Sequence, residues 1–465
     1  MASAWSVALL LLPVDPDYTA GELADHLRSW MEGAALYPHL EDGPPFRVLN
    51  YPPLVLALAR LVAGTGIDPL TAGRLTNLAG LVVLVGIVAA WARDRGARGH
   101  ALAGTVGLLG ASFPVLYAAG QLHIELWAAA GTLCGFWLLH RSVETATEVR
   151  GRRWVLPAAG VALALACLAK QTQVVPALVG LAWVAWHGGG RRALPAAMGF
   201  ALTGATGSLV ILLAFGEAAW THMVVYTVGT YSLTNLGLQM ASHLLPWALL
   251  LGAAGWLVAA GTRGRGASDP LVWLWVGSLA WTLSAARVGS SYPYFLDLHL
   301  ATVLLVGPRL FTVEESTDPR ALAPRWLRPL LALQVVGASL VVGVVLLGHL
   351  RAQHRLAEAL PRLCDALGEQ DPVVVGTPGL AVACGRQPLL HPFIMSSLAA
   401  QERWDPEDTA EGLAAGDFGP AVLPFDPRDG FPGAQADRWH PRLQRAIRSG
   451  TAVEPLPAGR WRVSW

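Results

Sequence analysis

Carboxylates gather at the start of a polar segment near the N-terminus, the first place in this sequence where chemistry can be expected. Asp15, Asp17, Glu22 and Asp25 closely follow the first apolar run, and the polar segment 15–54 lies between apolar stretches. Carboxylates at the edge of a membrane bundle are costly unless they do chemistry or bind a ligand. We therefore expect an active site in this segment, with a solvated acidic loop as the alternative.

Two further ionisable residues stand beside apolar runs. Glu125 opens a predicted helix, where the helix dipole favours a carboxylate, and a purely electrostatic role there is the alternative. Lys170 is the one lysine in a chain with 32 arginines. Its compact ammonium suits a point contact with phosphate, so an anion contact is predicted; a lysine snorkelling to the interface is the alternative.

A third cationic position lies in a glycine- and serine-containing turn. Arg287 precedes Gly289 and Ser290, which allow a backbone to approach a ligand closely, and Asp297 enters the next apolar run. A ligand contact by Arg287 is predicted, and a structural ion pair between Arg287 and Asp297 is the alternative. His123 lies two residues before Glu125, and a histidine at such a position is more often an interfacial residue than a catalytic one.

The composition places these residues in a membrane protein. Hydrophobic residues make up 54% of the 465 residues and charged residues only 14%, whereas soluble domains carry roughly 25% charged residues. A net charge of +1 excludes nucleic-acid binding as the main function of the protein.

Apolar runs recur along most of the chain. A membrane helix needs about 20 residues, so the shorter runs indicate tilted or broken spans. The first run, Met1–Leu12, is interpreted as the end of an anchoring helix whose start is truncated. With it, about 11 spans are expected, the others being Leu70–Ala92, Ala101–Ala119, His123–Leu139, Trp154–Ala169, Val174–Trp186, Ala193–Phe215, His243–Gly261, Leu271–Ala286, Phe295–Phe311 and Pro329–His349.

The distribution of arginine predicts the orientation. Alternate connectors hold 15 arginines, and the positive-inside rule places them in the cytoplasm. The polar segment near the N-terminus and the C-terminus then face outward. We expect a transmembrane catalytic domain over 1–349, with its catalytic outer loop at 14–52, and a small extracytoplasmic α/β domain over 350–465.

Cysteine usage and motifs add constraints. Cys364 and Cys384 lie in the predicted outer domain, where a disulfide is allowed, although two free thiols are almost as well supported. Cys134 and Cys167 fall within predicted helices. The sequence has no CxxC pair, no His/Cys metal spacing and no phosphate-binding GxxxxGK loop, which argues against ATP-driven transport by this chain alone.

Two features shape the polar segment itself. Apolar residues between Thr19 and Gly33 recur at the spacing of an amphipathic helix lying at the membrane interface. Asn50-Tyr51-Pro52-Pro53-Leu54 then returns the chain to the bilayer as a rigid extended turn.

These motifs together resemble the GT-C superfamily of polytopic glycosyltransferases, which includes protein O-mannosyltransferases and bacterial aminoarabinose transferases. The resemblance rests on the acidic motif after the first span, on the order of the later motifs and on the shared topology, and it spans most of the chain. The motifs, in chain order, are Glu32–Pro38, Tyr51-Pro52-Pro53-Leu54, Ala72-Gly73-Arg74-Leu75, Glu125, Lys170-Gln171-Thr172, Gly289–Asp297, Val382–Pro392 and Leu398–Asp405.

The resemblance implies an inverting transfer of a hexose or pentose from a polyprenyl-phosphate donor to an acceptor hydroxyl on the outer face of the cytoplasmic membrane. Asp17, or Asp15, would be the general base, assisted by Glu125. Lys170 and Arg287 would bind the donor phosphate. A divalent cation, if the reaction needs one, would bind Asp17 and Glu125. The predicted substrate-binding residues are Tyr51, His123, Gln171, Tyr294 and Asp297.

The partners that follow are a polyprenyl-phosphate sugar, membrane lipid and a glycan, lipid or protein acceptor. The preference for arginine over lysine, with many Ala, Gly and Pro residues, is typical of a GC-rich bacterial genome and favours an acceptor in the cell envelope. The sequence departs from the usual family pattern in having glutamate at 125 and two candidate aspartates around Pro16.

A polytopic transporter or lipid flippase is the main rival function. Transporters place ionisable residues near the bilayer midplane and often contain internal repeats. Here the charges cluster towards one predicted face and no convincing repeat is found. A non-catalytic scaffold is a third possibility, against which the acid, lysine and arginine at the expected places argue weakly.

Overall fold

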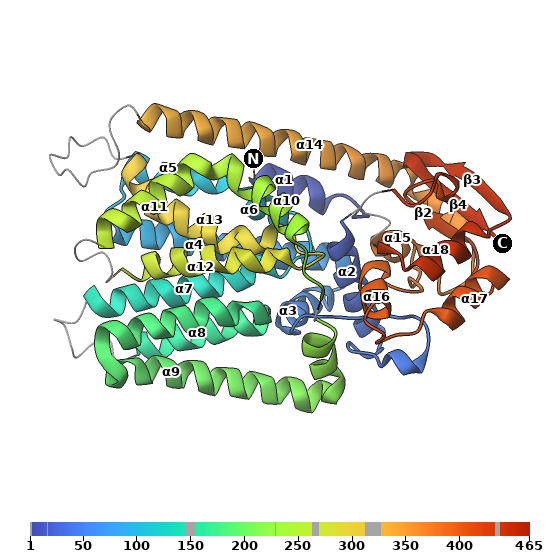
Figure 1. The fold of residues 1–465 in the computed structure, drawn as a ribbon, viewed down its shortest axis with the longest axis horizontal. Coiled ribbons are helices and arrows are strands. Elements are labelled where there is room, and N and C mark those ends of the chain that lie inside the picture. The colour runs from blue at the N-terminus through green and yellow to red at the C-terminus, as the bar shows by residue number, and fades with distance from the viewer. Residues whose placement is uncertain are drawn as a thin grey trace.

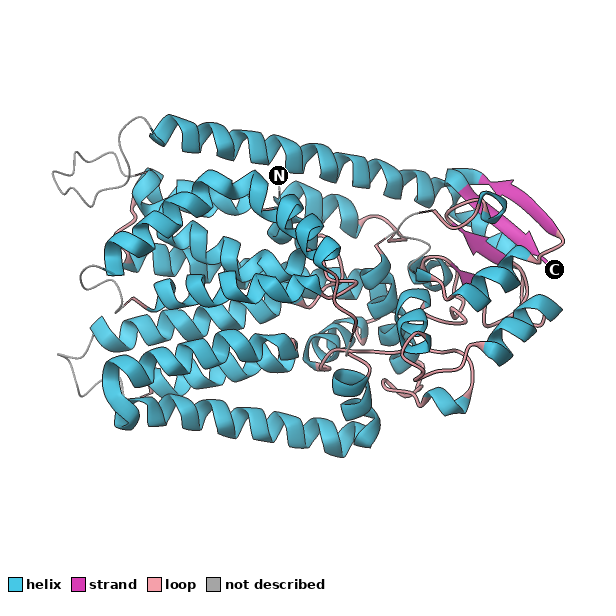
Figure 2. Cartoon of the chain, in the orientation of Figure 1, coloured by secondary structure: helices cyan, strands magenta, loops and turns pink. Residues whose placement is uncertain are grey.

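A bundle of apolar helices occupies most of the molecule, and a smaller region with a sheet lies at one end of it (Figures 1 and 2). The computed structural model describes residues 2–15, 17–144, 154–227, 229–262, 269–311, 327–432 and 438–465. The bundle helices are α1 (Ala2–Leu10), α3 (Leu54–Ala63), α4 (Pro69–Asp94), α5 (Gly99–Gly107), α6 (Phe113–Ala119), α7 (Glu125–Glu144), α8 (Val155–Ala169), α9 (Val174–Trp220), α10 (Leu233–Leu244), α11 (Ala248–Thr262), α12 (Pro270–Trp281), α13 (Leu296–Leu310) and α14 (Leu327–Leu367).

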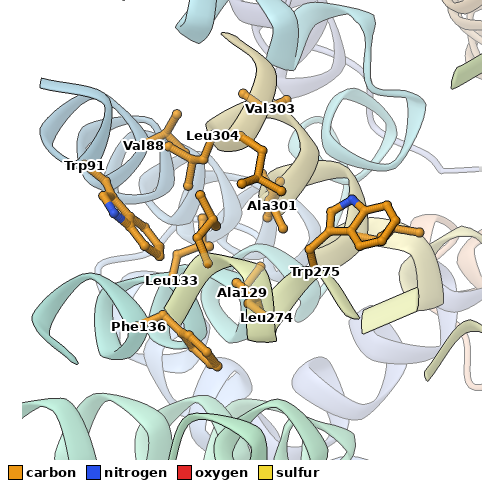
Figure 3. Packing of buried hydrophobic residues seen from close by; sticks show 14 of the residues in the cluster. Val88, Trp91, Ala129, Leu133, Phe136, Leu274, Trp275, Ala301, Val303 and Leu304 are labelled. Carbon is orange, nitrogen blue, oxygen red and sulfur yellow. The ribbon is translucent and has the colours of Figure 1, made fainter. Parts of the chain in front are cut away.

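Large apolar side chains form the core between the central helices. Figure 3 shows Val88 and Trp91 of α4 close to Leu133 and Phe136 of α7, with Leu304 of α13 beside them. All five are buried in one cluster. Other apolar side chains remain exposed along α9 and α14, up to 78% for Leu213 and 71% for Val344. An apolar surface of this extent belongs in lipid, so this is a membrane protein.

The helix lengths do not establish the number of membrane spans that the sequence predicts. In the described chain, four helices are long and apolar enough to cross a membrane, or five if the pair Gly99–Ala111 and Phe113–Ala119, bent by 76°, is one span. The expected count of about 11 stays a prediction. Two of the expected spans, Val174–Trp186 and Ala193–Phe215, lie within α9, whose helical backbone is interrupted at Gly189 with a φ of 71°.

The arginine-containing connectors that are described meet at the end of the bundle away from the sheet (Figure 1). Arg95 pairs with Asp269 across two connectors, with Nη1 and Oδ2 2.6 Å apart. Arg192 donates a hydrogen bond to the carbonyl of Ser142. The predicted arginine-rich connectors are 93–98, 141–153, 191–192, 263–265 and 309–328, of which 145–153, 263–265 and 312–326 lie outside the described residues.

The predicted interfacial helix is present as α2 (Tyr18–Met31), and it lies between the bundle and the sheet region (Figure 1). Its buried face includes Leu23 and Leu27. After α2 the chain continues to α3, a short apolar helix that begins directly after the Pro52-Pro53 turn. The sequence did not predict this helix.

The sheet region follows α14. Strands β1 (Val374–Val375), β2 (Ala421–Leu423), β3 (Ala452–Leu456) and β4 (Arg460–Ser464) pair in the order β1-β2-β4-β3. Only the β1–β2 pair is parallel. The strand-like runs of the sequence in the predicted α/β domain, 372–375 and 421–424, coincide with β1 and β2. The accompanying helices are α15 (Pro378–Ala383), α16 (Pro392–Ala399), α17 (Glu407–Ala415) and α18 (Pro441–Arg448).

Several contacts fix this region to α2 and to α14. A Cβ built on Gly21 of α2 would lie 2.4 Å from the backbone nitrogen of Gly379, so only glycine allows α15 to approach this closely. A disulfide joins Cys364 of α14 to Cys384, which resolves the two alternatives left by the sequence. The division into domains at residue 349 stays a prediction, because α14 runs through that position.

Candidate active site

Asp17 is the N-cap of α2, and this role fixes its carboxylate. Its Oδ1 accepts a hydrogen bond of 2.7 Å from the backbone N–H of Ala20. Its Oδ2 accepts one of 2.9 Å from the hydroxyl of Tyr117 on α6. The side chain keeps 15% of its surface exposed, whereas the side chain of Asp15 has none.

His123 lies between two carboxylates. Its Nε2 is 3.4 Å from Oδ1 of Asp17, and its Nδ1 is 3.3 Å from Oε2 of Glu125. Oε1 of Glu125 is in turn 3.0 Å from Nζ of Lys170. The four side chains form an alternating row of charges, Asp17–His123–Glu125–Lys170, contributed by α2, by the loop before α7, by α7 itself and by the end of α8.

The charges of this row determine the protonation of Asp17 and His123. Burial by itself would raise the pKa of the Asp17 carboxyl, but the hydrogen bond and the charge of His123 lower the pKa to about 2. Burial by itself would lower the pKa of His123, but its bonds to Asp17 and Glu125 raise the pKa to about 10. At neutral pH, Asp17 is therefore a carboxylate and His123 an imidazolium.

The stability of the protein should depend on this pair in a defined pH window. The folded-state pKa of His123 lies above its ordinary value of 6.5, so its contribution is complete below pH 6.5 and is lost as the pH rises through 10. The folded-state pKa of Asp17 lies below 3.8, so its contribution is lost as the pH falls through 2. We expect the difference in melting temperature between the wild type and His123→Asn to be largest between pH 4 and 6.5 and to disappear above about pH 10.

Thermal unfolding in detergent, followed by tryptophan fluorescence across this pH range, measures the difference. A difference that stays constant from pH 6 to pH 11 would contradict the assignment of a charged His123.

Asp15 has a different environment from Asp17. It has no exposed surface, and its Oδ2 is 2.9 Å from Nη2 of Arg74, which is 1% exposed. Its Oδ1 accepts hydrogen bonds from the backbone N–H of Asp17 and from Gln353. Arg74 also donates to the carbonyl of Leu9 in the last turn of α1 and to those of Leu12 and Val14 just after the helix. These contacts suit a residue that holds the loop in place. They leave neither carboxylate oxygen of Asp15 open to the hydroxyl of an acceptor substrate.

Asp15→Asn is accordingly expected to lower the free energy of unfolding by about 3–5 kcal/mol, because it leaves a buried guanidinium without a countercharge. The melting temperature of the purified protein measures the loss. Glu32→Gln is the matched control: it breaks the Arg28–Glu32 pair, in which Glu32 is 46% exposed, and should cost less than about 1 kcal/mol. Equal effects of the two changes would show that the Asp15–Arg74 pair is not a buried structural pair.

The other predicted phosphate contact, Arg287, is half-buried in the turn before α13. Within the described residues it forms no ion pair with Asp297, so the structural alternative for Arg287 is not realised. Its backbone is held by Asn235, which donates to the carbonyl of Arg287, and by a bridge to Tyr231. The guanidinium lies within electrostatic range of Tyr51, as does the carboxylate of Glu125.

The predicted substrate-binding residues fall into two groups. Tyr51 and Tyr294 lie beside the charged row: burial and the nearby Glu125 raise the pKa of Tyr51, and Nζ of Lys170 is 5.9 Å from the centre of the Tyr294 ring. Gln171 makes internal contacts, and Asp297 is buried within electrostatic range of Lys170. Gln171 donates to the carbonyls of Asn50 and Met223, and Asp297 is buried on α13 with Oδ1 unpartnered.

Glu22 and Asp25 form a second buried cluster on α2, with His391 at the start of α16. Oδ2 of Asp25 is 2.9 Å from Nε2 of His391, and Oε1 of Glu22 is 3.7 Å from its Nδ1. Burial raises the pKa of Glu22 to about 7. This cluster joins α2 to the sheet region.

Several residues of the site were given no role from the sequence, although Arg74 and Tyr292 lie within two of the motifs that carry the resemblance. They are polar or aromatic side chains inside apolar runs or next to them, and they complete the surroundings of Asp15, Asp17 and His123: Arg74, Tyr117, Gln121, Tyr292, His349 and Gln353. A buried polar residue in an apolar helix is itself a signal of function or of a partner.

The charged row does not suit the divalent cation that Asp17 and Glu125 were predicted to hold. Both carboxylates already contact the imidazolium of His123, whose positive charge opposes a cation between them. In the described part of the chain, no group of three or more His, Cys, Asp or Glu side chains is arranged to hold a metal ion. No step is therefore assigned to a metal.

The fold can be compared with solved structures. The chain resembles ArnT from Cupriavidus metallidurans bound to undecaprenyl phosphate, with a TM-score of 0.66 and 16% identity over 99% of this chain and 96% of that one. The apo state of the same protein gives a TM-score of 0.67 with 15% identity, covering 99% and 95% of the two chains. The chain has the GT-C fold.

A more distant GT-C neighbour supports the same fold. The archaeal oligosaccharyltransferase AglB from Archaeoglobus fulgidus, in complex with an inhibitory peptide and a dolichol-phosphate, matches with a TM-score of 0.51 and 10% identity over 97% of this chain and 72% of that chain. No protein-family model and no curated protein sequence matches the chain. At these identities, the likeness establishes the GT-C fold and not the reaction.

Proposed function

We propose that this GT-C protein is an inverting glycosyltransferase that moves a sugar from a polyprenyl-phosphate donor to an acceptor hydroxyl. The observation that carries the proposal is the row Asp17–His123–Glu125–Lys170, which places a partly exposed carboxylate and a buried lysine within one site. The two neighbouring folds are described with undecaprenyl phosphate and dolichol-phosphate, which supports a donor of the same chemical class.

In the proposed reaction, the acceptor oxygen attacks the anomeric carbon while the bond from that carbon to the phosphate oxygen breaks. The acceptor proton moves to Asp17. A carboxylate with so low a pKa is a weak base, so it takes the proton late, once the attacking hydroxyl has become acidic. Lys170 and Arg287 stabilise the negative charge that develops on the leaving polyprenyl phosphate.

His123 has a supporting part in this scheme. Its imidazolium holds Asp17 and Glu125 ionised at fixed positions, and Glu125 fixes the position of the Lys170 ammonium through their 3.0 Å contact. Tyr51 and Tyr294 form the aromatic surroundings of the sugar. Pre-positioned charges of this kind lower the barrier because they need no reorganisation during the reaction.

The proposed location is the outer face of the cytoplasmic membrane, with the sheet region extracytoplasmic. The arginine-containing connectors lie at the opposite end of the bundle (Figure 1). The disulfide between Cys364 and Cys384 belongs to an oxidising compartment, which supports the same orientation. A cell-envelope glycan or lipid is the acceptor class that we favour.

The test uses the full-length protein in nanodiscs with a panel of radiolabelled polyprenyl-phosphate hexoses and pentoses and with envelope lipid or glycan fractions. Transfer of label together with release of polyprenyl phosphate is the expected result. Movement of the labelled lipid across proteoliposome membranes without any cleavage of the sugar–phosphate bond would replace the transferase with a flippase.

A further inference from the structure

Half-buried side chains of α2 and of the sheet region meet next to Asp17. Tyr18 and Glu22 follow Asp17 on α2, and Phe393 belongs to α16. The backbone N–H of Phe393 donates a hydrogen bond of 2.9 Å to the hydroxyl of Tyr18, and their rings meet edge to face with centres 6.5 Å apart. The guanidinium carbon of Arg438, which precedes α18, lies 5.0 Å from the centre of the Tyr18 ring. The helix that carries the proposed base is therefore in direct contact with the sheet region.

Phe393 also contacts the turn that carries Arg287. A Cβ built on Gly289 would lie 2.2 Å from Cζ of Phe393, and Gly289 has a φ of 84°, so a side chain at this position would clash with the ring. The ring of Phe393 thus contacts both α2 and the turn with the proposed phosphate ligand. The sheet region contributes a wall to the site, and the proposed chemistry assigns no part to it.

The carboxyl of Glu22 is partly accessible and lacks a complete set of hydrogen bonds. Its Oε1 has no hydrogen-bond partner in the described part of the chain, since Nδ1 of His391 is 3.7 Å away. Asp25 contacts the other nitrogen of His391 at 2.9 Å and is 1% exposed, whereas Glu22 keeps 18% of its side chain exposed. A carboxylate oxygen without a donor is unfavourable, and the hydroxyl of a ligand can supply that donor.

Glu22 lies close to the reacting groups as well as to the sheet region. The charge of Asp17 acts on the carboxyl of Glu22, and the charges of Glu22 and Glu125 both act on the phenol of Tyr51. The positive charge of Arg438 also acts on Glu22, yet across the described residues the two side chains form no ion pair. Their donors and acceptors therefore remain available to a third group.

The two opposite charges select the kind of ligand that can bind between them. Glu22 would repel a phosphate, and Arg438 would repel an ammonium group. A neutral sugar avoids both costs, because one hydroxyl can donate to the carboxylate while the oxygen of a neighbouring hydroxyl accepts from the guanidinium. The rings of Tyr18 and Phe393 supply the aromatic surface that is common in small-molecule sites.

We propose that Glu22 and Arg438 bind a neutral sugar of a glycan acceptor and present its hydroxyl to Asp17, with Tyr18 and Phe393 as the aromatic wall of this subsite. The proposal rests on the proposed function and names the acceptor class for it. The subsite acts on acceptor binding, so its loss is expected in the affinity for the acceptor and not in the contacts with the donor phosphate.

The first experiment measures binding without any transfer. Full-length protein in fluorescent nanodiscs is applied to an array of neutral, phosphorylated and amino-sugar glycans, with empty nanodiscs as the blank. The wild type is expected to bind the neutral glycans in preference to both charged kinds. Glu22→Met and Arg438→Met should each weaken that binding at least about tenfold, the loss of hydrogen bonding to a charged group. Glu22→Gln, which keeps one acceptor oxygen, should lose less.

Asp25→Asn is the matched control, because Asp25 lies on the same helix and contacts the same histidine but is closed to ligands. It should lower the melting temperature and bind the glycans as the wild type does. Equal binding of neutral glycans by the wild type, Glu22→Met and Arg438→Met overturns the proposal. A wild type that binds only phosphorylated or amino-sugar glycans, or none, overturns it as well.

Kinetics separate this proposal from the proposed function. In the transfer assay, with a glycan that binds on the array as acceptor, Glu22→Met should raise the KM for that glycan about tenfold and leave the KM for the donor within a factor of two. A purely structural Glu22 would change the amount of active protein and neither KM. Glycan binding that depends on Glu22 without any sugar transfer removes the proposed function and keeps the subsite, whereas transfer with glycan binding independent of Glu22 removes the subsite alone.

Discussion

Asp17→Asn is expected to lower the rate of sugar transfer by about 10²- to 10⁴-fold, the usual cost of removing a general base. The amide cannot take the acceptor proton. Asparagine is as good an N-cap as aspartate, so α2 keeps the cap that Asp17 gives to the N–H of Ala20. The loss should therefore appear in kcat, with the melting temperature lowered only by the missing charge contact to His123.

The measurement is the initial rate of label transfer at saturating donor, with binding of the donor lipid followed separately. Asp68→Asn is a matched control, because Asp68 caps α4 in the same way, with its side chain accepting from the N–H of Thr71. It should transfer sugar at the wild-type rate. A fully active Asp17→Asn protein would show that Asp17 is not the general base.

The contrast with Asp15 shows what the sequence was able to predict. Two aspartates separated by one proline have the same local pattern, and both were candidates for the base. Their difference comes from Arg74 and Gln353, which are 59 and 338 residues away from Asp15. A partner this distant leaves no periodicity or spacing in the local sequence, so only the fold separates a structural aspartate from an accessible one.

Other parts of the site were predictable because their signals are local. The amphipathic spacing after Asp17 predicted α2, which is confirmed at Tyr18–Met31. The isolated Lys170 and the helix-opening Glu125 were both singled out, but their mutual contact of 3.0 Å was not expected. His123 was assigned to substrate binding, whereas the structure places it between Asp17 and Glu125.

The fold, like the site, was predictable only where the sequence carries a local signal. The apolar runs predicted a helical membrane protein, and strand-like runs marked two of the four strands. Span counting is less direct. The interruption of α9 at Gly189 falls between two runs that the sequence already separated, whereas the 76° bend between Gly99–Ala111 and Phe113–Ala119 falls inside the single predicted run 101–119. The short helix α3 was missed since its ten residues fall below the length of a span.

Lys170→Met should weaken binding of a polyprenyl monophosphate by about 10- to 100-fold, the loss of one hydrogen bond from a charged donor to a phosphate. Methionine keeps the length of the side chain and removes its charge. Lys170 is only 8% exposed, so no solvent-exposed cation can replace it without moving the end of α8. Titration with the lipid, followed by native mass spectrometry or by the shift in melting temperature, measures the affinity.

The single variant also leaves Glu125 buried beside one cation fewer, and the destabilisation that follows could by itself lower binding. The double variant Lys170→Met, Glu125→Gln removes both charges and should recover stability without recovering affinity. Arg60→Met removes an exposed cation near α2, where Arg60 lies over the ring of Trp30, and should bind the lipid normally. If the double variant binds as tightly as the wild type, Lys170 serves to neutralise Glu125 and the phosphate contact must be assigned to Arg287.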